Sequence, residues 1–394
     1  MKILMLTPYL PYPLWSGGQI RTFNLLKHLS KKHDITLFSF IREEKEKNYI
    51  KVLNNFCSEV KVFVKRPPWS LTSLALAGIS YYPLVVCMYL KMEVKNSISE
   101  AINRKKFDLI HAETFYVMPN IPQNNIPIIL AEQTIEYLVY RHHTQQVGFL
   151  PQKLLMELDV AKIHYWEKSF WKRAKRVIAM SEADKILMQK RHQKLVVDLV
   201  PNGVDTDFFT VKTEKQKNKM KTVLFVGNFK WLQNREAVTL LVRDVWPRIK
   251  AKLPSKVRLS IVGRHPPAQI AGLEAGDISI EENVDDIRRS YAAADVLLAP
   301  IYGPGGTRYK ILESMAAGLP VVTTPTGIEG LAAVNKRDAL IEDGPEALAD
   351  ATVKLLTDNK LYRKLAASGR LLVEKNFSWT EISNRLDRIY QQSV

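Results

Sequence analysis

Short apolar runs alternate with longer amphipathic stretches through the first half of the chain. The longest helical pattern covers Lys153–Trp171. Strands separated by helices in this way form parallel sheets with helices on their faces. The first half is therefore expected to be an α/β domain. Its predicted strands are Lys2–Leu6, Asp34–Phe40, Val60–Val64, Asp108–His111, Pro127–Leu130, Arg176–Ala179 and Val196–Val200.

The same alternation restarts after a polar turn sequence, Pro201-Asn-Gly-Val-Asp-Thr-Asp207. A chain of 394 residues is also too long for one core of ordinary size. We expect two doubly wound domains, residues 1–200 and 201–377. A terminal amphipathic helix in 378–394 begins at Ser378 or Thr380 and can pack back on the first domain. The predicted strands of the second domain are Thr222–Val226, Arg258–Val262, Ile278–Glu281, Val296–Ala299 and Val321–Thr323.

The segment between the strand ending at Pro300 and the next helix has the properties of an anion site. Its glycines leave backbone amides accessible, and a threonine can cap the helix. Two cations in the first turn oppose the helix dipole unless an anion lies there. Amides, dipole and cations together predict a phosphate site. The residues are Gly303, Gly305, Gly306, Thr307, Arg308 and Lys310.

A glutamate follows on the same predicted helix. Glu313 comes six residues after Thr307, which places it ~9 Å along the helix axis at ~1.5 Å per residue. That distance suits a carboxylate that accepts hydrogen bonds from a ribose. The alternative is a surface pair with Lys310, worth about 0.2–0.5 kcal/mol. The ligand interpretation is favoured because a surface pair would not require the preceding glycines.

The first domain also carries glycines where its first strand passes into a helix. Gly17 and Gly18 allow close approach of a ligand to the backbone, and Arg21 occupies the first helical turn. The carboxyl ends of parallel strands are where doubly wound domains bind ligands. Because the spacing differs from Gly-x-Gly-x-x-Gly, a dinucleotide cofactor is not expected. If the two domains face each other at these edges, one cleft lies between them.

Charge and cysteine content narrow the choice of partners and compartment. The net charge is +17, from 57 Lys and Arg against 40 Asp and Glu, which favours nucleotides, nucleic acid or an acidic membrane face. No zinc-finger spacing or base-stacking strand pattern is present, so no nucleic-acid partner is expected. The two cysteines, Cys57 and Cys87, form no disulfide framework, which fits a reducing cytoplasm.

Residues Trp69–Leu90 form the one long stretch without charge. Gly78 and Pro83 interrupt it, which argues against a transmembrane helix. Two interpretations remain: helices that dip into a bilayer surface, or a helical pair packed within the domain. The first would place the chain at the inner face of a cell membrane, with flanking cations on anionic headgroups. Those cations are Lys61, Lys65, Arg66, Lys91 and Lys95.

The motifs, in their order and spacing, resemble those of GT-B glycosyltransferases, and more closely the retaining transferases of glycosyltransferase family four. The resemblance covers nearly the whole chain and implies two Rossmann-like domains. It rests on Gly17-Gly18, Phe107-Asp-Leu-Ile-His111, Pro201-Asn-Gly-Val-Asp-Thr-Asp-Phe-Phe209, Val226-Gly-Asn228, Ile261-Val-Gly-Arg264, Val284-Asp-Asp-Ile287, the helix Gly306 to Gly318 and Pro320-Val-Val322.

The resemblance implies roles for individual residues. Glu313 would hold the donor ribose, the loop Gly303–Thr307 the diphosphate or sugar, and the backbone near Val284 the nucleobase. His111 is similar to the histidine at the end of a first-domain strand in this family, although Glu113 could take that place. The remaining donor-binding candidates are Gly17, Gly18, Gly227, Asn228, Lys230 and Arg264.

Two features depart from the family pattern. Gly305 stands where the family commonly has a second glutamate, and Asn228 and Gln233 stand where an arginine and a lysine usually follow the second domain's first strand. Arg308 and Lys310 can supply the missing charge, and Lys230 can add to it. The sequence therefore resembles a subgroup with Gly-Gly-Thr-Arg-x-Lys-x-x-Glu.

The function implied is transfer of a sugar from a nucleotide diphosphate sugar to a saccharide or lipid-linked saccharide acceptor, in bacterial surface polysaccharide or glycolipid assembly. Arg308 and Lys310 would stabilise the leaving diphosphate. No cofactor or metal is expected, since Asp205-Thr-Asp207 is interpreted as turn chemistry. Two alternatives stay open: an epimerase or phosphorylase of the same architecture, or a non-catalytic membrane-associated subunit.

Overall fold

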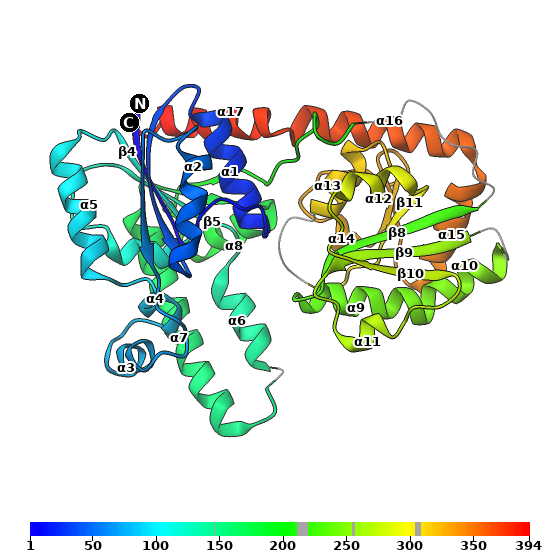
Figure 1. The fold of residues 1–394 in the computed structure, drawn as a ribbon, viewed down its shortest axis with the longest axis horizontal. Coiled ribbons are helices and arrows are strands. Elements are labelled where there is room, and N and C mark those ends of the chain that lie inside the picture. The colour runs from blue at the N-terminus through cyan, green and yellow to red at the C-terminus, as the bar shows by residue number, and fades with distance from the viewer. Residues whose placement is uncertain (146, 211–219, 254–256, 304–308) are drawn as a thin grey trace. The chain divides into compact units, whose positions relative to one another are not determined.

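The computed structural model describes residues 1–145, 147–210, 220–253, 257–303 and 309–394. These residues form two compact units, each with its own sheet (Figure 1). The first unit comprises Met1–Pro201 and Ile382–Val394, and the second comprises Asn202–Glu381. The assignment of the units to acceptor and donor remains a prediction.

The first unit contains a seven-stranded sheet in the order β3-β2-β1-β4-β5-β6-β7, paired in parallel throughout. The central strands β4 and β5 are buried along their whole length. Their nearly continuous apolar residues suit this position, because helices cover both faces of a parallel sheet. The strands are β1 (Lys2–Thr7), β2 (Asp34–Ile41), β3 (Glu59–Val64), β4 (Leu109–Glu113), β5 (Ile128–Glu132), β6 (Arg176–Ala179) and β7 (Val197–Leu199).

Helices fill the connections between these strands. Two of them, α6 and α7, form an antiparallel hairpin that extends beyond the sheet (Figure 1). The helices are α1 (Gly17–Leu29), η1 (Glu44–Tyr49), α2 (Ile50–Leu53), α3 (Leu71–Ile79), α4 (Leu84–Cys87), α5 (Met92–Arg104), η2 (Phe115–Asn120), α6 (Glu136–Gln145), α7 (Leu150–Arg173) and α8 (Glu182–Arg191).

The last helix, α17 (Trp379–Gln391), packs on the first unit through polar contacts. The Tyr390 hydroxyl lies 2.8 Å from Nδ1 of His111. Asp387 accepts from Lys32 at 2.8 Å and lies 2.9 Å from the His33 ring. Near the amino end of α17, the Ser378 hydroxyl accepts from the Glu381 amide at 3.3 Å. The chain terminus is thus bound to the first unit rather than exposed as a tail.

The second unit repeats the architecture with a six-stranded parallel sheet, in the order β10-β9-β8-β11-β12-β13. Its strands are β8 (Lys221–Asn228), β9 (Val257–Arg264), β10 (Ile278–Glu282), β11 (Val296–Ala299), β12 (Val321–Thr323) and β13 (Leu340–Ile341). Its helices are α9 (Leu232–Leu240), η3 (Leu241–Val245), α10 (Trp246–Lys252), α11 (Ala268–Ala271), α12 (Ile287–Ala293), α13 (Tyr309–Ala316), α14 (Pro325–Ile328), α15 (Pro345–Thr357) and α16 (Asn359–Asn376).

The prediction of two doubly wound parallel sheets is confirmed. Every predicted strand is present with its ends shifted by at most a few residues, and only the two-residue strand β13 was not predicted. Within Trp69–Leu90, helix α4 is buried in the first unit, whereas α3 is mostly exposed. Contact of this stretch with a bilayer surface stays a prediction. Across the described ranges, no helix combines the length and apolar character that a bilayer span needs.

Each sheet reverses its strand order at one point. In the first unit the reversal lies between β1 and β4, and in the second between β8 and β11. The loops that leave neighbouring strands at such a point go to opposite faces and open a crevice at the carboxyl ends of the strands. These two places are therefore where the fold itself predicts ligand sites.

Candidate functional site

In the second unit, predicted site residues gather at the strand-order reversal. Gly227 and Asn228 end β8, and Gly303 follows its neighbour β11. Helix α13 starts nearby at Tyr309 and carries Lys310 in its first turn. The predicted residues Gly305, Gly306, Thr307 and Arg308 lie outside the described residues.

Lys310 contacts Asn234 and Phe225 at this point. Its ammonium donates to Oδ1 of Asn234 at 2.7 Å and lies 4.3 Å from the centre of the Phe225 ring. Asn234 in turn donates through Nδ2 to the carbonyl of Asn228 at 2.8 Å. A cation over a ring face and on an amide oxygen has a restricted position. The contacts therefore fix the ammonium beside the end of β8.

Glu313 lies one turn further along α13 and is partly buried. The Tyr291 hydroxyl donates to its Oε2 at 2.7 Å. Burial raises the pKa of the Glu313 carboxyl, while the Tyr291 hydrogen bond and the charge of Lys310 oppose that rise. The carboxylate is thus oriented by Tyr291 of a neighbouring helix, α12.

Glycines let the surrounding loops approach one another closely. A β-carbon on Gly303 would lie 2.8 Å from the Cβ of Gln233, and one on Gly227 would lie 3.2 Å from the Cγ of Asn234. Real β-carbons do not approach other atoms closer than about 3 Å, so Gly303 cannot carry a side chain without a shift of α9. These glycines serve the packing of the site whether or not they also contact a ligand.

The other predicted donor-binding residues lie at or just after the ends of β8, β9 and β10. Lys230 is exposed, and its amide donates to the Asn228 side chain at 3.1 Å. Arg264 ends β9 with an exposed side chain, and its carbonyl accepts from Phe229 at 2.9 Å. Val284 is partly buried against the core. The part of Arg264 and Val284 in a donor site remains a prediction.

In the first unit, a buried polar chain runs across the strand-order reversal between β1 and β4. Glu113, the last residue of β4, accepts from Gln133 at 3.2 Å, and Gln133 also donates to the Tyr9 hydroxyl. Gly18 in the first turn of α1 lies against the same groups. A β-carbon there would lie 2.6 Å from Oε1 of Gln133 and closer still to Tyr9. Gly18 is therefore required by the packing of this loop.

His111 lies within this polar chain and is completely buried. Its Nε2 is 3.2 Å from Oε1 of Glu113, and its Nδ1 is 2.8 Å from the Tyr390 hydroxyl. Both ring nitrogens therefore have protein partners. The contact with Tyr390 joins strand β4 to the terminal helix α17. A direct role of His111 in catalysis remains a prediction.

Glu113 is buried but charged. Burial would raise the pKa of its carboxyl, yet the hydrogen bond from His111 and the charges of His111 and Arg21 lower it overall. The Arg21 guanidinium is itself buried and donates to the carbonyl of Pro201 at 2.9 Å. This unit thus holds a buried carboxyl with a lowered pKa and a buried guanidinium, the latter on the same helix, α1, as Gly17 and Gly18.

Asp205 and Asp207 occupy a turn at the start of the second unit. Oδ1 of Asp205 accepts from the amides of Asp207 and Phe208 at 3.1 and 2.9 Å, which is the turn chemistry expected from the sequence. Within the described part of the chain, no group of three or more His, Cys, Asp and Glu side chains could hold a metal ion.

Sequence reasoning missed the residues that orient the predicted ones. Asn234 orients Lys310, Tyr291 orients Glu313, and Gln133 joins Glu113 to Tyr9. A weak signal existed for Gln133, because it follows the last residue of β5 directly, at the ligand-binding edge of the sheet. No such signal marked Tyr291, since its position lies in the middle of a helix.

Comparisons with known proteins agree with this architecture. The chain is 29% identical over 201 residues to a phosphatidyl-myo-inositol mannosyltransferase of Mycobacterium leprae, an alignment that covers 49% of this chain and 52% of that protein. The chain thus spans about half the length of this curated relative. It is 20% identical over 395 residues to an uncharacterized 44.6 kDa protein in the cps region of Klebsiella pneumoniae, covering 95% and 96% of the two chains.

Solved structures share the fold at low identity. WaaG, a glycosyltransferase involved in lipopolysaccharide biosynthesis, has a TM-score of 0.67 at 17% identity over 99% of both chains. HepE of Anabaena, solved in complex with UDP and glucose, has a TM-score of 0.65 at 17% identity over 100% of both chains. A glycosyltransferase of Rickettsia africae has a TM-score of 0.69 at 17% identity, over 99% of this chain and 98% of that one.

Two family models match the sequence itself. Glycosyltransferase Family 4 matches residues 15–208, and Glycosyl transferases group 1 matches residues 220–358. Together they cover both units and their motifs. The chain therefore belongs to glycosyltransferase family 4, as the resemblance of its motifs predicted, and its two parallel sheets have the GT-B architecture of that family.

Proposed function

We propose that this protein is a retaining glycosyltransferase that moves a sugar from a nucleoside diphosphate sugar to an acceptor hydroxyl. One observation carries the proposal above the rest. At the strand-order reversal of the second unit, Lys310 is oriented by Asn234, and Glu313 follows on the same helix. In a nucleoside diphosphate the charged diphosphate calls for a cation and the ribose hydroxyls for an acceptor, and this helix carries a cation in its first turn and a carboxylate one turn later.

In the proposed reaction, the bond between the anomeric carbon and the phosphate oxygen breaks, and a bond to the acceptor oxygen forms on the same face of the sugar. The acceptor's proton passes to the departing phosphate oxygen. Negative charge grows on the diphosphate, where Lys310 and Arg308 stabilise it, assisted by the amides of Gly305, Gly306 and Thr307. No separate general base and no metal or cofactor are required.

With the diphosphate beside Lys310, the rest of the donor lies along the carboxyl ends of the neighbouring strands. Glu313 accepts from the ribose hydroxyls, and the backbone near Val284 contacts the nucleobase. Gly227, Asn228, Lys230 and Arg264 line the carboxyl ends of the neighbouring strands β8 and β9.

The first unit supplies the acceptor side. Gly17 and Gly18 bring the backbone of α1 to the acceptor or the phosphate. His111 acts on the reaction through Glu113, to which it is hydrogen-bonded, because its own nitrogens are both occupied. Glu113 is the group closer to the end of the strand and remains ionised.

The acceptor we propose is a saccharide or a lipid-linked saccharide in bacterial surface polysaccharide or glycolipid assembly. The names of the relatives support this class, since one acts on phosphatidyl-myo-inositol and WaaG takes part in lipopolysaccharide biosynthesis. HepE was solved with UDP-glucose, which makes a UDP-sugar the first donor to test. We place the protein in the cytoplasm, peripheral at the inner face of the cell membrane.

A two-step experiment tests this function. A thermal-shift screen with UDP-, GDP- and ADP-sugars identifies the donor, and product analysis with and without acceptor in excess chelator identifies the reaction. We expect sugar transfer only with acceptor and full activity in chelator. Conversion of the donor without acceptor would instead indicate an epimerase, and the absence of any nucleotide affinity would indicate a non-catalytic subunit. Activity lost in chelator and restored by magnesium would contradict the metal-independent mechanism.

A further inference from the structure

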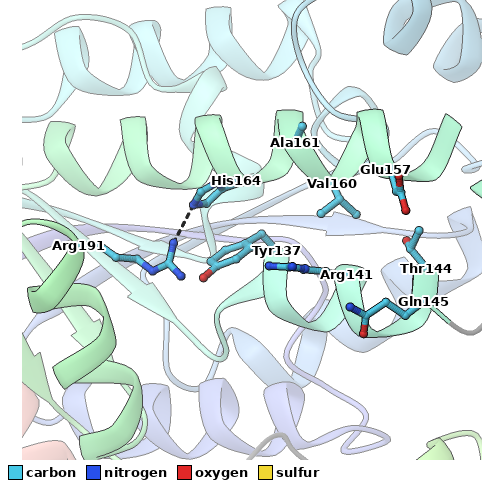
Figure 2. Close-up of a pocket in the computed structure, with 9 residues that line it drawn as sticks. All are labelled: Tyr137, Arg141, Thr144, Gln145, Glu157, Val160, Ala161, His164 and Arg191. Carbon is cyan, nitrogen blue, oxygen red and sulfur yellow. Dashed lines mark hydrogen bonds between the residues drawn. The ribbon is translucent and has the colours of Figure 1, made fainter. Parts of the chain in front are cut away.

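A cavity of about 430 Å³ lies in the first unit, among helices α6, α7 and α8 (Figure 2). None of the residues assigned above to the donor or the acceptor lines it. Its walls carry Tyr137 and Arg141 from α6, Glu157 and His164 from α7, and Arg191 from α8. It therefore needs an explanation of its own.

Two polar groups in this wall lack partners. Tyr137 is only 3% exposed, yet its hydroxyl makes no hydrogen bond to any residue that the structure describes. The same holds for Nε of Arg191. A buried polar group without a partner costs free energy unless a ligand or water satisfies it. The two groups thus mark a position where a hydrogen-bonding acceptor fits.

The charges around the cavity favour an anion. The Arg191 guanidinium donates to Nε2 of His164 at 2.9 Å and lies 4.8 Å from the centre of the Tyr137 ring (Figure 2). Burial and the nearby cations lower the pKa of His164, so its ring is neutral and accepts this hydrogen bond. Among the described residues neither Arg191 nor Arg141 forms an ion pair, and the lining itself holds one carboxyl, the exposed Glu157. The buried Glu167 lies behind Tyr137, whose amide it accepts from at 3.4 Å, and burial raises its pKa to about 8, which favours its neutral form.

An apolar ridge adjoins the cavity on helix α7. Leu150, Leu154 and Leu158 are spaced four residues apart and therefore follow one side of the helix. They are 64%, 54% and 64% exposed, which is unusual for leucines on one face. Glu157 and Ala161 of the cavity wall alternate with them along α7.

A second group of exposed apolar side chains lies on the segment around helix α3, which is bonded to α7. Lys162 of α7 donates to the carbonyl of Ala77 at 2.6 Å, and Trp166 donates to the carbonyl of Tyr81 at 2.7 Å, so the two segments are joined. The α3 segment itself exposes large apolar side chains, among them Ile79 at 88%. By contrast, Lys61, Lys65 and Arg66, expected at anionic headgroups, bond to protein groups.

We propose that the α6–α8 cavity binds the phosphate of a membrane phospholipid, whose acyl chains lie along the ridge of Leu150, Leu154 and Leu158. An anion pocket beside an exposed apolar ridge matches an amphiphile better than a free anion. The Tyr137 hydroxyl donates to a phosphate oxygen, and Arg141 and Arg191 neutralise its charge. The inference rests on the membrane location proposed above, to which it gives a specific site.

Vesicle sedimentation tests the proposal directly and needs no sugar donor. The full chain is mixed with phosphatidylcholine vesicles that contain or lack phosphatidylglycerol. We expect Tyr137→Phe and Arg141→Gln each to weaken binding to the anionic vesicles by about tenfold, the factor that a hydrogen bond to a charged group contributes. Tyr137→Phe should leave the melting temperature unchanged or higher, because its hydroxyl has no protein partner.

Two matched variants serve as controls. Tyr165→Phe removes an exposed tyrosine hydroxyl from the neighbouring helix α7, and Lys51→Gln removes one exposed positive charge from α2. Both should bind anionic vesicles as the unchanged protein does. If Tyr137→Phe and Arg141→Gln behave like these controls, the proposal is wrong.

Soluble probes separate the sources of the phosphate. Dihexanoyl phosphatidic acid should raise the melting temperature more than inorganic phosphate at equal concentration, and Leu154→Glu with Leu158→Glu should remove the difference. Equal rises in melting temperature with the two probes would show that the cavity binds free phosphate, and the proposal of a lipid ligand would be wrong. A dimer that dissociates in the same double variant would assign the ridge to a second copy, with the same consequence. Sugar transfer to a soluble acceptor is measured separately, because it needs no lipid. Loss of vesicle binding with transfer retained would concern the lipid site alone, whereas absence of transfer would concern the proposed function.

Discussion

The side-chain ammonium of Lys310 donates a 2.7 Å hydrogen bond to Oδ1 of Asn234, joining helix α13 to helix α9. The two helices follow adjacent strands, β11 and β8, at the point where the strand order reverses. The contact holds a cation near the start of a helix, where the dipole disfavours it. We interpret this as a position prepared for an anion.

Lys310→Met should remove that cation while keeping the length and apolar packing of the side chain. We expect turnover to fall about 10²–10³-fold, the loss typical of one preorganised group that stabilises developing charge. Steady-state kinetics with the identified donor provide the measurement. Lys354→Met, on helix α15 of the same unit, is a matched control that should retain activity.

Asn234→Ala should act through Lys310 rather than on the substrate. We expect kcat to fall by about tenfold, because one positioning hydrogen bond is lost, while KM for the donor changes less. Asn234→Asp retains an oxygen acceptor at the same position and should restore much of the rate. If both variants instead raise KM for the donor equally and leave kcat unchanged, Asn234 contacts the donor and does not position Lys310.

Glu313→Gln should weaken donor binding more than it slows turnover, because the amide cannot accept at both oxygens from two ribose hydroxyls. Affinity for the ribonucleoside diphosphate should fall, whereas affinity for its 2′,3′-dideoxy analogue should not. An equal loss for both nucleotides would show that Glu313 supports the helix instead.

The raised pKa of Glu313 makes donor binding depend on pH. Protonation removes the acceptor, so affinity should fall as the pH decreases, beginning above the range of an ordinary carboxyl. The Tyr291 hydrogen bond opposes the rise in pKa, so Tyr291→Phe should move this loss to still higher pH. Calorimetric titration of the nucleotide at several pH values measures both effects. A pH profile that Tyr291→Phe leaves unchanged would contradict the assignment.

Gly18→Ala should destabilise the first unit by about 1–3 kcal/mol, the usual cost of forcing an extra carbon into a packed position. Its β-carbon would collide with Tyr9 and Gln133. Gly78→Ala in α3 is the matched control, since no atom lies within 4 Å of its added carbon. That variant should gain about 0.5–1 kcal/mol, because alanine restricts the unfolded chain and favours helix. Chemical denaturation measures both, and equal stabilities would refute the packing argument.

Two buried carboxyls, Glu132 at the end of β5 and Glu167 on α7, should make stability depend on pH. Burial raises the pKa of Glu167 to about 8, and burial with the Glu167 charge raises that of Glu132 well above its usual range. The folded state therefore holds protons that the unfolded state releases above the ordinary value of 4.5. The free energy of unfolding should fall as the pH rises from there to about 8.

Glu167→Gln should make that dependence on pH shallower. Its amide oxygen can still accept from the Glu136 amide, which Glu167 does at 2.7 Å, so the helix start is preserved. Glu100→Gln, an exposed carboxyl on α5, is the control. Denaturation at a series of pH values provides the test, and an unchanged slope in Glu167→Gln would exclude this group as the cause.

Strand positions could be predicted because buried parallel strands are continuous apolar runs, as in Val296–Ala299 and Arg176–Ala179, both recovered without error. The two-residue strand β13, Leu340–Ile341, has too few residues for a pattern. Gly18 was singled out from the sequence as a point where a ligand approaches the backbone. The structure shows that Tyr9 and Gln133 pack against it, and contact with a ligand stays a prediction.

The side chains that orient the site could not be predicted in the same way. Tyr291 reaches Glu313 across 22 residues of sequence, and Asn234 reaches Lys310 across 76. Such contacts depend on how helices pack, which no local pattern encodes. The burial of His111 against Tyr390 is similarly set by a helix 279 residues away.

The most direct test of the central claim is a calorimetric titration that compares a nucleoside diphosphate with its nucleoside, in the unchanged protein and in Lys310→Met. We expect the unchanged protein to bind the diphosphate much more tightly than the nucleoside. In Lys310→Met most of this difference should disappear while nucleoside binding persists. A Lys310→Met protein that still prefers the diphosphate by the full margin would show that the anion lies elsewhere.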